Sequence, residues 1–370
     1  AGCESAGAGD NDSENGDDAS GDVTLQDGDS FRSVKVTVDG DSSWFEVIDG
    51  SVTGTSLSAT ITRASDSWEF EGETLTVSFT EDAENKLTFT NSSLGLYATG
   101  RLSLDGDTYM LRSTDLTDDE GEVQLGIAAA TAATNTTLNG DYFVAIVHSR
   151  TDQSEGFFTG AYNNINDSVY MNFNNGTIEV PGAPDTDRDL NDDADYSNNS
   201  EPYDYTISPT GELTVDPDAD IFPRPLVGQV RADGELFILA DTRTDPPTTD
   251  NSVKTVFIGI KTHDGEEDLL AGTWDFGDLY SGYESGEPFS WDESSTTMVL
   301  DAAGEGTWST TPTDPESGEG EVSIDLATDG SFSLPAWNTV GAVTASGDVM
   351  VMLRNDIRIR DGVSIGIKTP

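Results

Sequence analysis

The chain has 370 residues, of which 70 are acidic and 17 are basic, so its formal net charge at pH 7 is −53. This charge argues against binding to nucleic acid or to an anionic lipid surface, because both need clustered Lys and Arg. A single cysteine excludes an intramolecular disulfide framework and a cysteine-based zinc site. The 15 Phe, 10 Tyr and 6 Trp nevertheless supply enough apolar surface for hydrophobic cores.

Residues 1–24 differ from the rest of the chain. They consist mainly of Gly, Asp, Asn, Ser, Ala and Glu and contain no basic residue. Such a segment cannot bury enough apolar surface to offset chain entropy, so it predicts a flexible, self-repelling tether. Its start, Ala1-Gly2-Cys3, resembles the end of a lipoprotein signal, in which the cysteine receives the lipid. Cys3 is therefore the predicted lipidation site, and the alternative is a secreted protein with an incidental cysteine.

Two signatures recur three times after the tether. The first is a pair of glycines six residues apart that precedes an apolar strand, and it begins at Gly100, Gly228 and Gly341. The second is a glycine between apolar residues, found at Gly126, Gly259 and Gly366. Their repeated order predicts three tandem modules. The predicted boundaries are 25–134, 135–266 and 267–370.

Each module has the pattern of an antiparallel β meander. Clusters of Gly, Asp, Ser, Asn and Pro divide the third module into candidate strands at 271–279, 296–302, 305–310, 321–327, 331–334, 340–345, 348–354 and 362–368. The Asp-Gly pairs at 105–106 and 233–234 are typical of two-residue hairpin turns. No long stretch has the apolar period of a helix. The chain is therefore predicted to be all-β.

Three features resemble the lipocalin-like domains of bacterial lipoproteins. They are the Leu-x-Gly-Thr-Trp motif at 270–274, the segment 205–215 and the apolar final strand. The resemblance implies eight-stranded barrels. The residues themselves leave a single six-bladed propeller and β sandwiches open as alternatives. Val256–Ile260 and Val349–Leu353 are apolar on both faces, which would suit the inner strands of propeller blades.

Residues that could support catalysis are sparse. His148 and His263 are the only histidines, and no Gly-x-Ser-x-Gly turn is present. His263 lies in an acidic linker, and both histidines are interpreted as structural. Close pairs of carboxylates arise by chance in so acidic a chain, so they do not indicate a glycosidase. The protein is predicted not to be an enzyme.

One acidic segment suggests a metal ion. Oxygen-bearing side chains alternate along it, as in the first half of a calcium loop, at Asp185, Asp187, Asp189, Asn191 and Asp193. Leu190 stands where such loops have glycine, and Tyr196 stands where they have glutamate. Ca²⁺ is thus the one candidate ion, and a solvated acidic loop is the alternative.

Tryptophans suggest a second type of site. Trp274 and Trp308 fall inside predicted strands and are expected in the core. Trp291 and Trp337 lie near predicted turns. Exposed aromatic rings can stack on sugars, so Trp291 and Trp337 are the candidate ligand-binding residues.

Together these features predict an exported, lipid-anchored cell-surface protein with a non-enzymatic binding or structural role. Its expected partner is a polysaccharide, a matrix component or another copy of the chain, with no nucleic acid and no resident cofactor. The first alternative is a lipocalin-like carrier of a small apolar ligand. The second is a polysaccharide-degrading enzyme on a propeller. Abundant Asp and a preference for Arg over Lys also predict adaptation to high salt.

Overall fold

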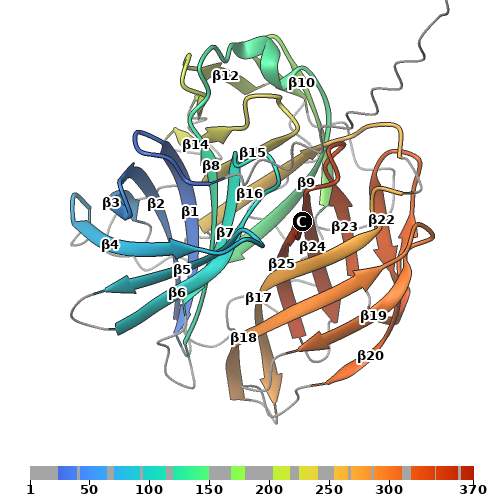
Figure 1. Cartoon of the computed structure of the whole chain (residues 1–370). Helices are drawn as coiled ribbons and strands as arrows, with labels where there is room; N and C mark the ends of the chain where they lie inside the picture. Colours follow the sequence, from blue (N-terminus) through green and yellow to red (C-terminus); the bar gives the residue numbers. More distant parts are fainter. Residues whose placement is uncertain are drawn as a thin grey trace, which may run out of the picture.

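The computed structural model describes residues 24–39, 42–64, 71–91, 95–113, 120–149, 168–179, 203–216, 225–240, 254–265, 268–284, 287–310, 318–337, 339–356 and 360–370. Within these ranges the chain forms antiparallel strands and two short 3-10 helices, η2 (Asn135–Leu138) and η3 (Pro335–Trp337). The strands build three barrels, which lie at the corners of a triangle (Figure 1). The all-β prediction and the three-barrel prediction are confirmed, and the propeller alternative was wrong.

Barrels 1 and 2 are closed meanders of eight strands, each of which pairs with its neighbours in sequence. In barrel 1, β8 pairs back with β1; in barrel 2, β16 pairs back with β9. Barrel 1 contains β1 (Ser30–Asp39), β2 (Ser42–Thr53), β3 (Ser56–Ala64), β4 (Thr74–Glu81), β5 (Lys86–Asn91), β6 (Gly95–Leu102), β7 (Thr108–Ser113) and β8 (Glu120–Ala128). Barrel 2 contains β9 (Gly140–Ser149), β10 (Ser168–Asn174), β11 (Thr177–Glu179), β12 (Tyr203–Ile207), β13 (Glu212–Val215), β14 (Leu226–Val230), β15 (Leu236–Ala240) and β16 (Lys254–Lys261).

Barrel 3 is a nearly closed sheet of nine strand segments in which β17 pairs with the last strand, β25. Its strands are β17 (Gly272–Glu284), β18 (Glu287–Leu300), β19 (Glu305–Thr310), β20 (Glu319–Ser323), β21 (Asp325–Leu326), β22 (Ser331–Leu334), β23 (Thr339–Val343), β24 (Val349–Asp356) and β25 (Arg360–Lys368). The single strand predicted at 321–327 changes partner at Ile324, because β20 pairs with β19 and β21 pairs with β22.

The first repeated signature has a structural cause. A Cβ atom on Gly228 would lie 1.8 Å from the carbonyl oxygen of Ile238 on the neighbouring strand, so only glycine fits there. The second glycine of the same copy, Gly234, has a φ of 76°, which glycine adopts without strain. The turn that contains it spans 231–235, five residues in place of the two expected from Asp-Gly. Asp233 stabilises this longer turn by accepting a hydrogen bond from the backbone N–H of Glu235 (2.8 Å).

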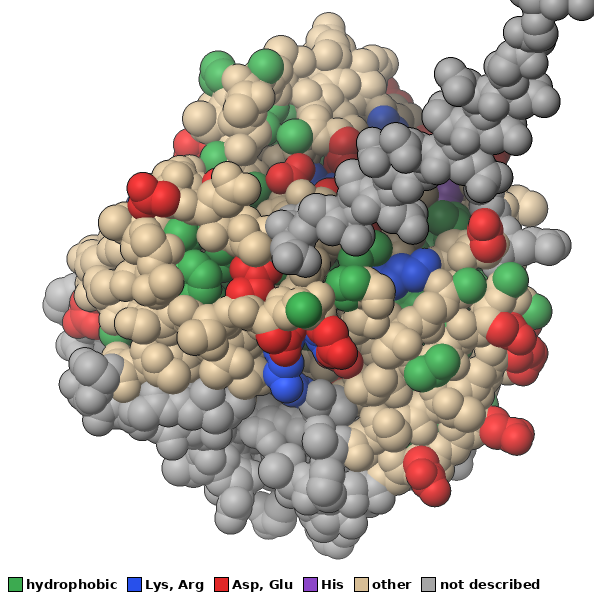
Figure 2. All heavy atoms as spheres, in the orientation of Figure 1, with side chains coloured by type: hydrophobic (Ala, Val, Ile, Leu, Met, Phe, Trp, Pro, Cys, Tyr) green, Lys and Arg blue, Asp and Glu red, His purple; other side chains and the backbone are tan. Residues whose placement is uncertain are grey.

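Packing between barrels explains the strands that are apolar on both faces. In β24, Met350 and Met352 point into barrel 3, whereas Val349 and Val351 belong to a core that all three barrels share. Barrel 1 and barrel 2 contribute strand residues to the same shared core, among them Val34, Leu125, Val147 and Ile258. The pattern that suggested propeller blades therefore marks the strands on which the barrels meet. Acidic side chains are scattered over the outer surface in the view of Figure 2.

Candidate functional site

The interior of barrel 1 is only partly filled. One end is packed with large side chains, including Phe31, Leu87, Leu102 and Tyr109. Towards the other end lies a cavity of about 260 Å³, which we call the barrel 1 cavity. Its apolar wall includes Ile48, Leu57, Val77, Phe89 and Leu111. It adjoins strand ends that lead into 40–41, 65–70, 92–94 and 114–119, which lie outside the described residues.

The interior of barrel 2 is different at its centre. Aromatic rings pack there edge to face, with 5.1 Å between the centroids of Tyr142 and Phe173 and 5.2 Å between those of Phe173 and Phe237. Tyr205 adds a further ring 5.4 Å from Phe173. These side chains occupy the space that a ligand would need, so the barrel 1 cavity is the better candidate site.

Strand alternation places charged side chains in the barrel 1 cavity. Successive residues of a strand point to opposite faces, so Lys35 points into the barrel while Val34 and Val36 join the shared core. Lys35 is directly opposite Glu46 on β2. Glu122 on β8 is opposite Thr37, one inward position further along β1. The two pairings therefore bring one ammonium group and two carboxylates together on one side of the cavity.

Ion pairs connect these charged groups. The Nζ of Lys35 lies 2.6 Å from Oε2 of Glu46 and 3.2 Å from Oε1 of Glu122. Glu46 is only 4% exposed. Its Oε2 is the oxygen that forms the ion pair with Lys35. The ammonium therefore lies between two carboxylates at the side of the cavity.

A network of neutral hydrogen bonds fixes Gln124, which lines the cavity. Gln124 Nε2 donates to the hydroxyls of Ser33 (2.7 Å) and Tyr109 (2.9 Å). Burial raises the pKa of Tyr109, so its hydroxyl stays protonated at neutral pH. Because Gln124 and Tyr109 are fixed in this way, the ionic groups above them are the polar groups best placed to meet a ligand.

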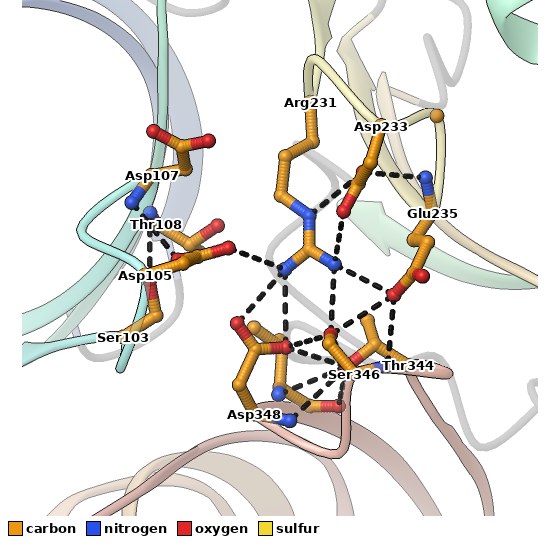
Figure 3. A network of polar contacts seen from close by, with 12 residues as sticks. Ser103, Asp105, Asp107, Thr108, Arg231, Asp233, Glu235, Thr344, Ser346 and Asp348 are labelled. Atoms are coloured by element: carbon orange, nitrogen blue, oxygen red, sulfur yellow. Dashed lines mark hydrogen bonds and ion pairs between the residues drawn. The ribbon is translucent and has the colours of Figure 1, made fainter. Parts of the chain in front are cut away.

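A second buried ionic cluster lies where the three barrels meet (Figure 3). It is formed by the equivalent turns 103–107, 231–235 and 344–348, one from each barrel, and we call it the central junction. The fully buried Arg231 reaches both oxygens of Asp348 from barrel 3, at 3.0 and 3.1 Å. It also lies 3.8 Å from Asp105 of barrel 1.

The remaining nitrogens of Arg231 also have hydrogen-bond acceptors. Nε donates to Asp233 (3.0 Å), and Nη2 donates to Glu235 (2.8 Å) and to Ser346 (3.0 Å). Burial alone would raise the pKa of Asp348, but the charge of Arg231 and hydrogen bonds from Ser346 and Thr344 outweigh it, so that pKa is lowered. Each guanidinium nitrogen has at least one acceptor, and these acceptors come from barrels 2 and 3, so this cluster connects barrels.

Pairwise contacts join the same barrels. Arg32 of barrel 1 forms an ion pair with Glu212 of barrel 2 (2.9 Å), and Arg101 of barrel 1 pairs with Asp275 of barrel 3. Tyr170 of barrel 2 donates to Asp329 of barrel 3 (2.9 Å). Together with the central junction, these contacts fix the three barrels against one another.

Two of the sites predicted from the sequence lie outside the described residues. They are the lipidation site Cys3 and the calcium segment with Asp185, Asp187, Asp189, Asn191 and Asp193. Within the described ranges, no group of three or more His, Cys, Asp and Glu side chains could hold a metal ion. No helix in those ranges is long and apolar enough to cross a membrane.

The tryptophans and histidines are placed only in part. Trp274 is fully buried, as expected for a core residue. Trp337 lies in η3, partly buried, with its ring edge to face against Trp308 at 5.4 Å. Trp291 is part of β18, but its side chain lies outside the description, as does that of His148. His263 contacts the carbonyl oxygen of Val343 (2.9 Å), which agrees with a structural role.

Sequence reasoning missed Lys35, Glu46 and Glu122. Each is followed directly by a residue of the shared core: Val36, Val47 and Val123. The same alternation is typical of a strand with one face in solvent. From the sequence alone, these three charged residues would therefore be placed on the solvent-exposed face, whereas they line the inside of barrel 1. The signal that could have identified them was the alternation in β1 together with the predicted closure of the sheet into a barrel, because closure turns one face of each strand inwards.

Comparison with known proteins finds similarity among solved structures but not among family models or curated sequences. No protein-family model matches the chain, and no curated protein matches it in sequence. Among solved structures it is similar to transferrin-binding protein B from Haemophilus parasuis, with a TM-score of 0.30, 9% identity, and coverage of 92% of this chain and 76% of that one. For the same protein from Neisseria meningitidis the TM-score is 0.28, with 9% identity, 88% of this chain and 66% of that one.

Proposed function

We propose that the chain is a non-enzymatic binding protein of the cell surface that holds a small, mainly apolar ligand inside barrel 1. The observation that carries this proposal is the barrel 1 cavity, a space of about 260 Å³ with an apolar wall and a few convergent polar groups. Small-molecule sites commonly combine these two features, since the wall supplies affinity and the polar groups fix orientation.

The size of the cavity limits the ligand. A volume of about 260 Å³ equals that of roughly nine water molecules at about 30 Å³ each. A ligand of about ten non-hydrogen atoms would fill it. Contact with Leu57, Phe89 and Leu111 favours an aromatic ring or a short branched chain, because apolar surface removed from water contributes about 25 cal/mol per Å².

The location at the cell surface rests on residues 1–24. An acidic tether that begins with a lipidated Cys3 would hold the barrels outside the cell, anchored to the membrane but not spanning it. A polysaccharide, a matrix component or a second copy would instead bind the outer surface. The partial burial of Trp337 against Trp308 leaves less of its ring for stacking on a sugar, so the cavity is the better-supported site.

Calorimetric titration with phenethyl alcohol and with indole tests the proposal, because both compounds have the required size and apolar character. We expect saturable binding to the wild type and its loss in Ala59→Phe, since Ala59 lines the cavity. Thr76→Phe is the matched control: Thr76 is exposed on β4 and does not line the cavity, so binding should persist. No saturable heat from either compound, or equal binding to both variants, would refute cavity binding.

A further inference from the structure

Acceptor motifs for N-glycosylation recur along the chain, and the structure separates two of them. The motif is an asparagine followed two residues later by Ser or Thr, and the sugar is attached to the side-chain amide. Its copies begin at Asn11, Asn91, Asn135, Asn166, Asn175 and Asn198. Two of these copies, at Asn135 and Asn175, have all three residues within the described ranges.

The amide of Asn135 is occupied by packing inside barrel 2. Its Oδ1 accepts a hydrogen bond from the backbone N–H of Ile207 (2.8 Å), and its Nδ2 donates to the carbonyl oxygen of Tyr205 (3.4 Å). Gly176 lies against the same nitrogen, since a Cβ atom on Gly176 would be 3.1 Å from Nδ2. A sugar on this nitrogen would need space that β12 and the turn at Gly176 fill, so the folded protein offers no acceptor at Asn135.

Asn175 has the opposite environment. It is exposed in the two-residue turn between β10 and β11, with a φ of 48° followed by a φ of 107° at Gly176, as tight hairpin turns require. Its backbone N–H donates to Oδ1 of Asn139 (2.8 Å), which fixes the turn. Its side-chain amide makes no hydrogen bond to any described residue. A fixed backbone therefore presents this amide to solvent.

The strand that follows the turn is short enough to open locally. β11 has three residues, and two of them pair with β12. Segments with so few backbone hydrogen bonds open at a lower free energy than the body of a fold. Thr177, which completes the motif, donates its hydroxyl to the carbonyl oxygen of Asn174 (2.9 Å) within the same turn. The motif can thus enter an enzyme active site without unfolding of barrel 2 as a whole.

We propose that Asn175 is an N-glycosylation site. A membrane oligosaccharyltransferase would join Nδ2 of Asn175 to the anomeric carbon of a saccharide carried on a lipid phosphate. The bond between that carbon and the phosphate oxygen breaks, and the amide proton leaves with the released lipid phosphate. This inference goes beyond ligand binding in barrel 1 and shares with the proposed function only the export of the chain.

Mass spectrometry of the full chain isolated from the organism in which it occurs tests this inference. Chymotrypsin cleaves after Phe173, which separates Asn175 from the preceding motif at Asn166. We expect a sugar on Asn175 in the peptide that begins at Asn174, and no sugar on Asn135. An unmodified Asn175 would overturn the inference. A sugar on Asn135 would overturn the selection of acceptors by the fold.

Variants produced in the same organism test the motif itself. Asn175→Gln and Thr177→Val should both lose the sugar, because each removes one element of the motif. Thr177→Ser keeps the hydroxyl, and Asn174→Gln makes the same amide change at the exposed neighbouring position, so both should keep the sugar. A sugar that persists in this peptide of Asn175→Gln would overturn the assignment to Asn175. None of these results alters the calorimetric test of the barrel 1 cavity, so the two proposals fail separately.

Discussion

Two buried ionic clusters in this molecule each surround one base with carboxylates, yet their environments differ. At the central junction, Arg231 is fully buried, and each of its three nitrogens has a partner in the turns of the three barrels. In barrel 1, Lys35 lies between Glu46 and Glu122 beside a cavity of about 260 Å³. The first cluster is buried between barrels, whereas the second borders free space inside one barrel.

The choice of base matches this difference. Arginine presents five N–H donors in a rigid planar fork, so it can hold several acceptors in fixed directions. Lysine presents a compact charge on a flexible stem, which tolerates rearrangement when a ligand enters. Of the two buried ion clusters, only the one that borders free space is a candidate binding site.

Replacing Arg231 by Met should have the largest effect. The substitution leaves Asp348, which is 2% exposed, without its cation, and removal of one partner of a buried pair typically costs about 3–5 kcal/mol. We expect this loss in the free energy of unfolding measured by urea denaturation. Arg63→Met is the matched control, because Arg63 is exposed and its one side-chain hydrogen bond to a described residue goes to the carbonyl oxygen of its neighbour Thr62. Equal effects of the two substitutions would contradict a structural role for the central junction.

The central junction should also make stability depend on acid. The lowered pKa of Asp348 means that its contribution is present above its unfolded pKa of about 3.9 and is lost as pH falls through the folded value. Burial raises the pKa of Asp107 in the same cluster. Protonation of Asp107 therefore favours the folded state as pH falls, which partly offsets the loss at Asp348. We therefore expect the wild type to lose stability below about pH 4.

The matched variant for this pH dependence is Asp348→Asn, which keeps the shape of the side chain but cannot titrate. It should be less stable at neutral pH and lose less stability on acidification, as measured by thermal unfolding at a series of pH values. If the variant shows the same acid dependence as the wild type, other carboxylates, such as Asp329 with its lowered pKa, control acid unfolding.

The sequence predicted the repeats and the all-β fold because these depend on local chemistry. Each copy needs one glycine where strands are crowded and one glycine in a turn, as at Gly228 and Gly234, so the same spacing recurs in the sequence. Hydrophobicity on both faces of β24 was visible too, but its cause was not, since a propeller and packed barrels bury such a strand equally well.

The ionic clusters could not be predicted, because each is assembled from distant segments. Arg231 and Asp348 are 117 residues apart, and Lys35 and Glu122 are 87 apart. In so acidic a chain, the carboxylates of these pairs look like all the others. Only the pairing of strands and the packing of barrels select them. The boundaries 25–134, 135–266 and 267–370, the lipidation of Cys3 and the calcium segment stay predictions.

Replacing Lys35 by Met should have a smaller effect than the same change at Arg231. The barrel 1 cavity offers Glu46 and Glu122 room for water once the ammonium is gone, so we expect a loss of about 1–2 kcal/mol, between that of an exposed and a fully buried pair. A loss as large as that of Arg231→Met would show that Lys35 is as integral to folding as Arg231.

Salt should affect repulsion among surface carboxylates more than the ion pairs of the central junction. The expected effect on the contribution of Arg231 is the smallest of these predictions. Raising NaCl from about 0.1 M to about 1 M shortens the Debye length from about 10 Å to about 3 Å, which weakens repulsion among surface carboxylates in a chain of net charge −53. The melting temperature of the wild type should rise. Buried pairs are screened much less, so the difference in unfolding free energy between wild type and Arg231→Met should change by less than about 0.5 kcal/mol. If that difference becomes markedly smaller at high salt, water and ions reach Arg231. If the melting temperature of the wild type does not change with salt, the prediction of adaptation to a saline habitat is wrong.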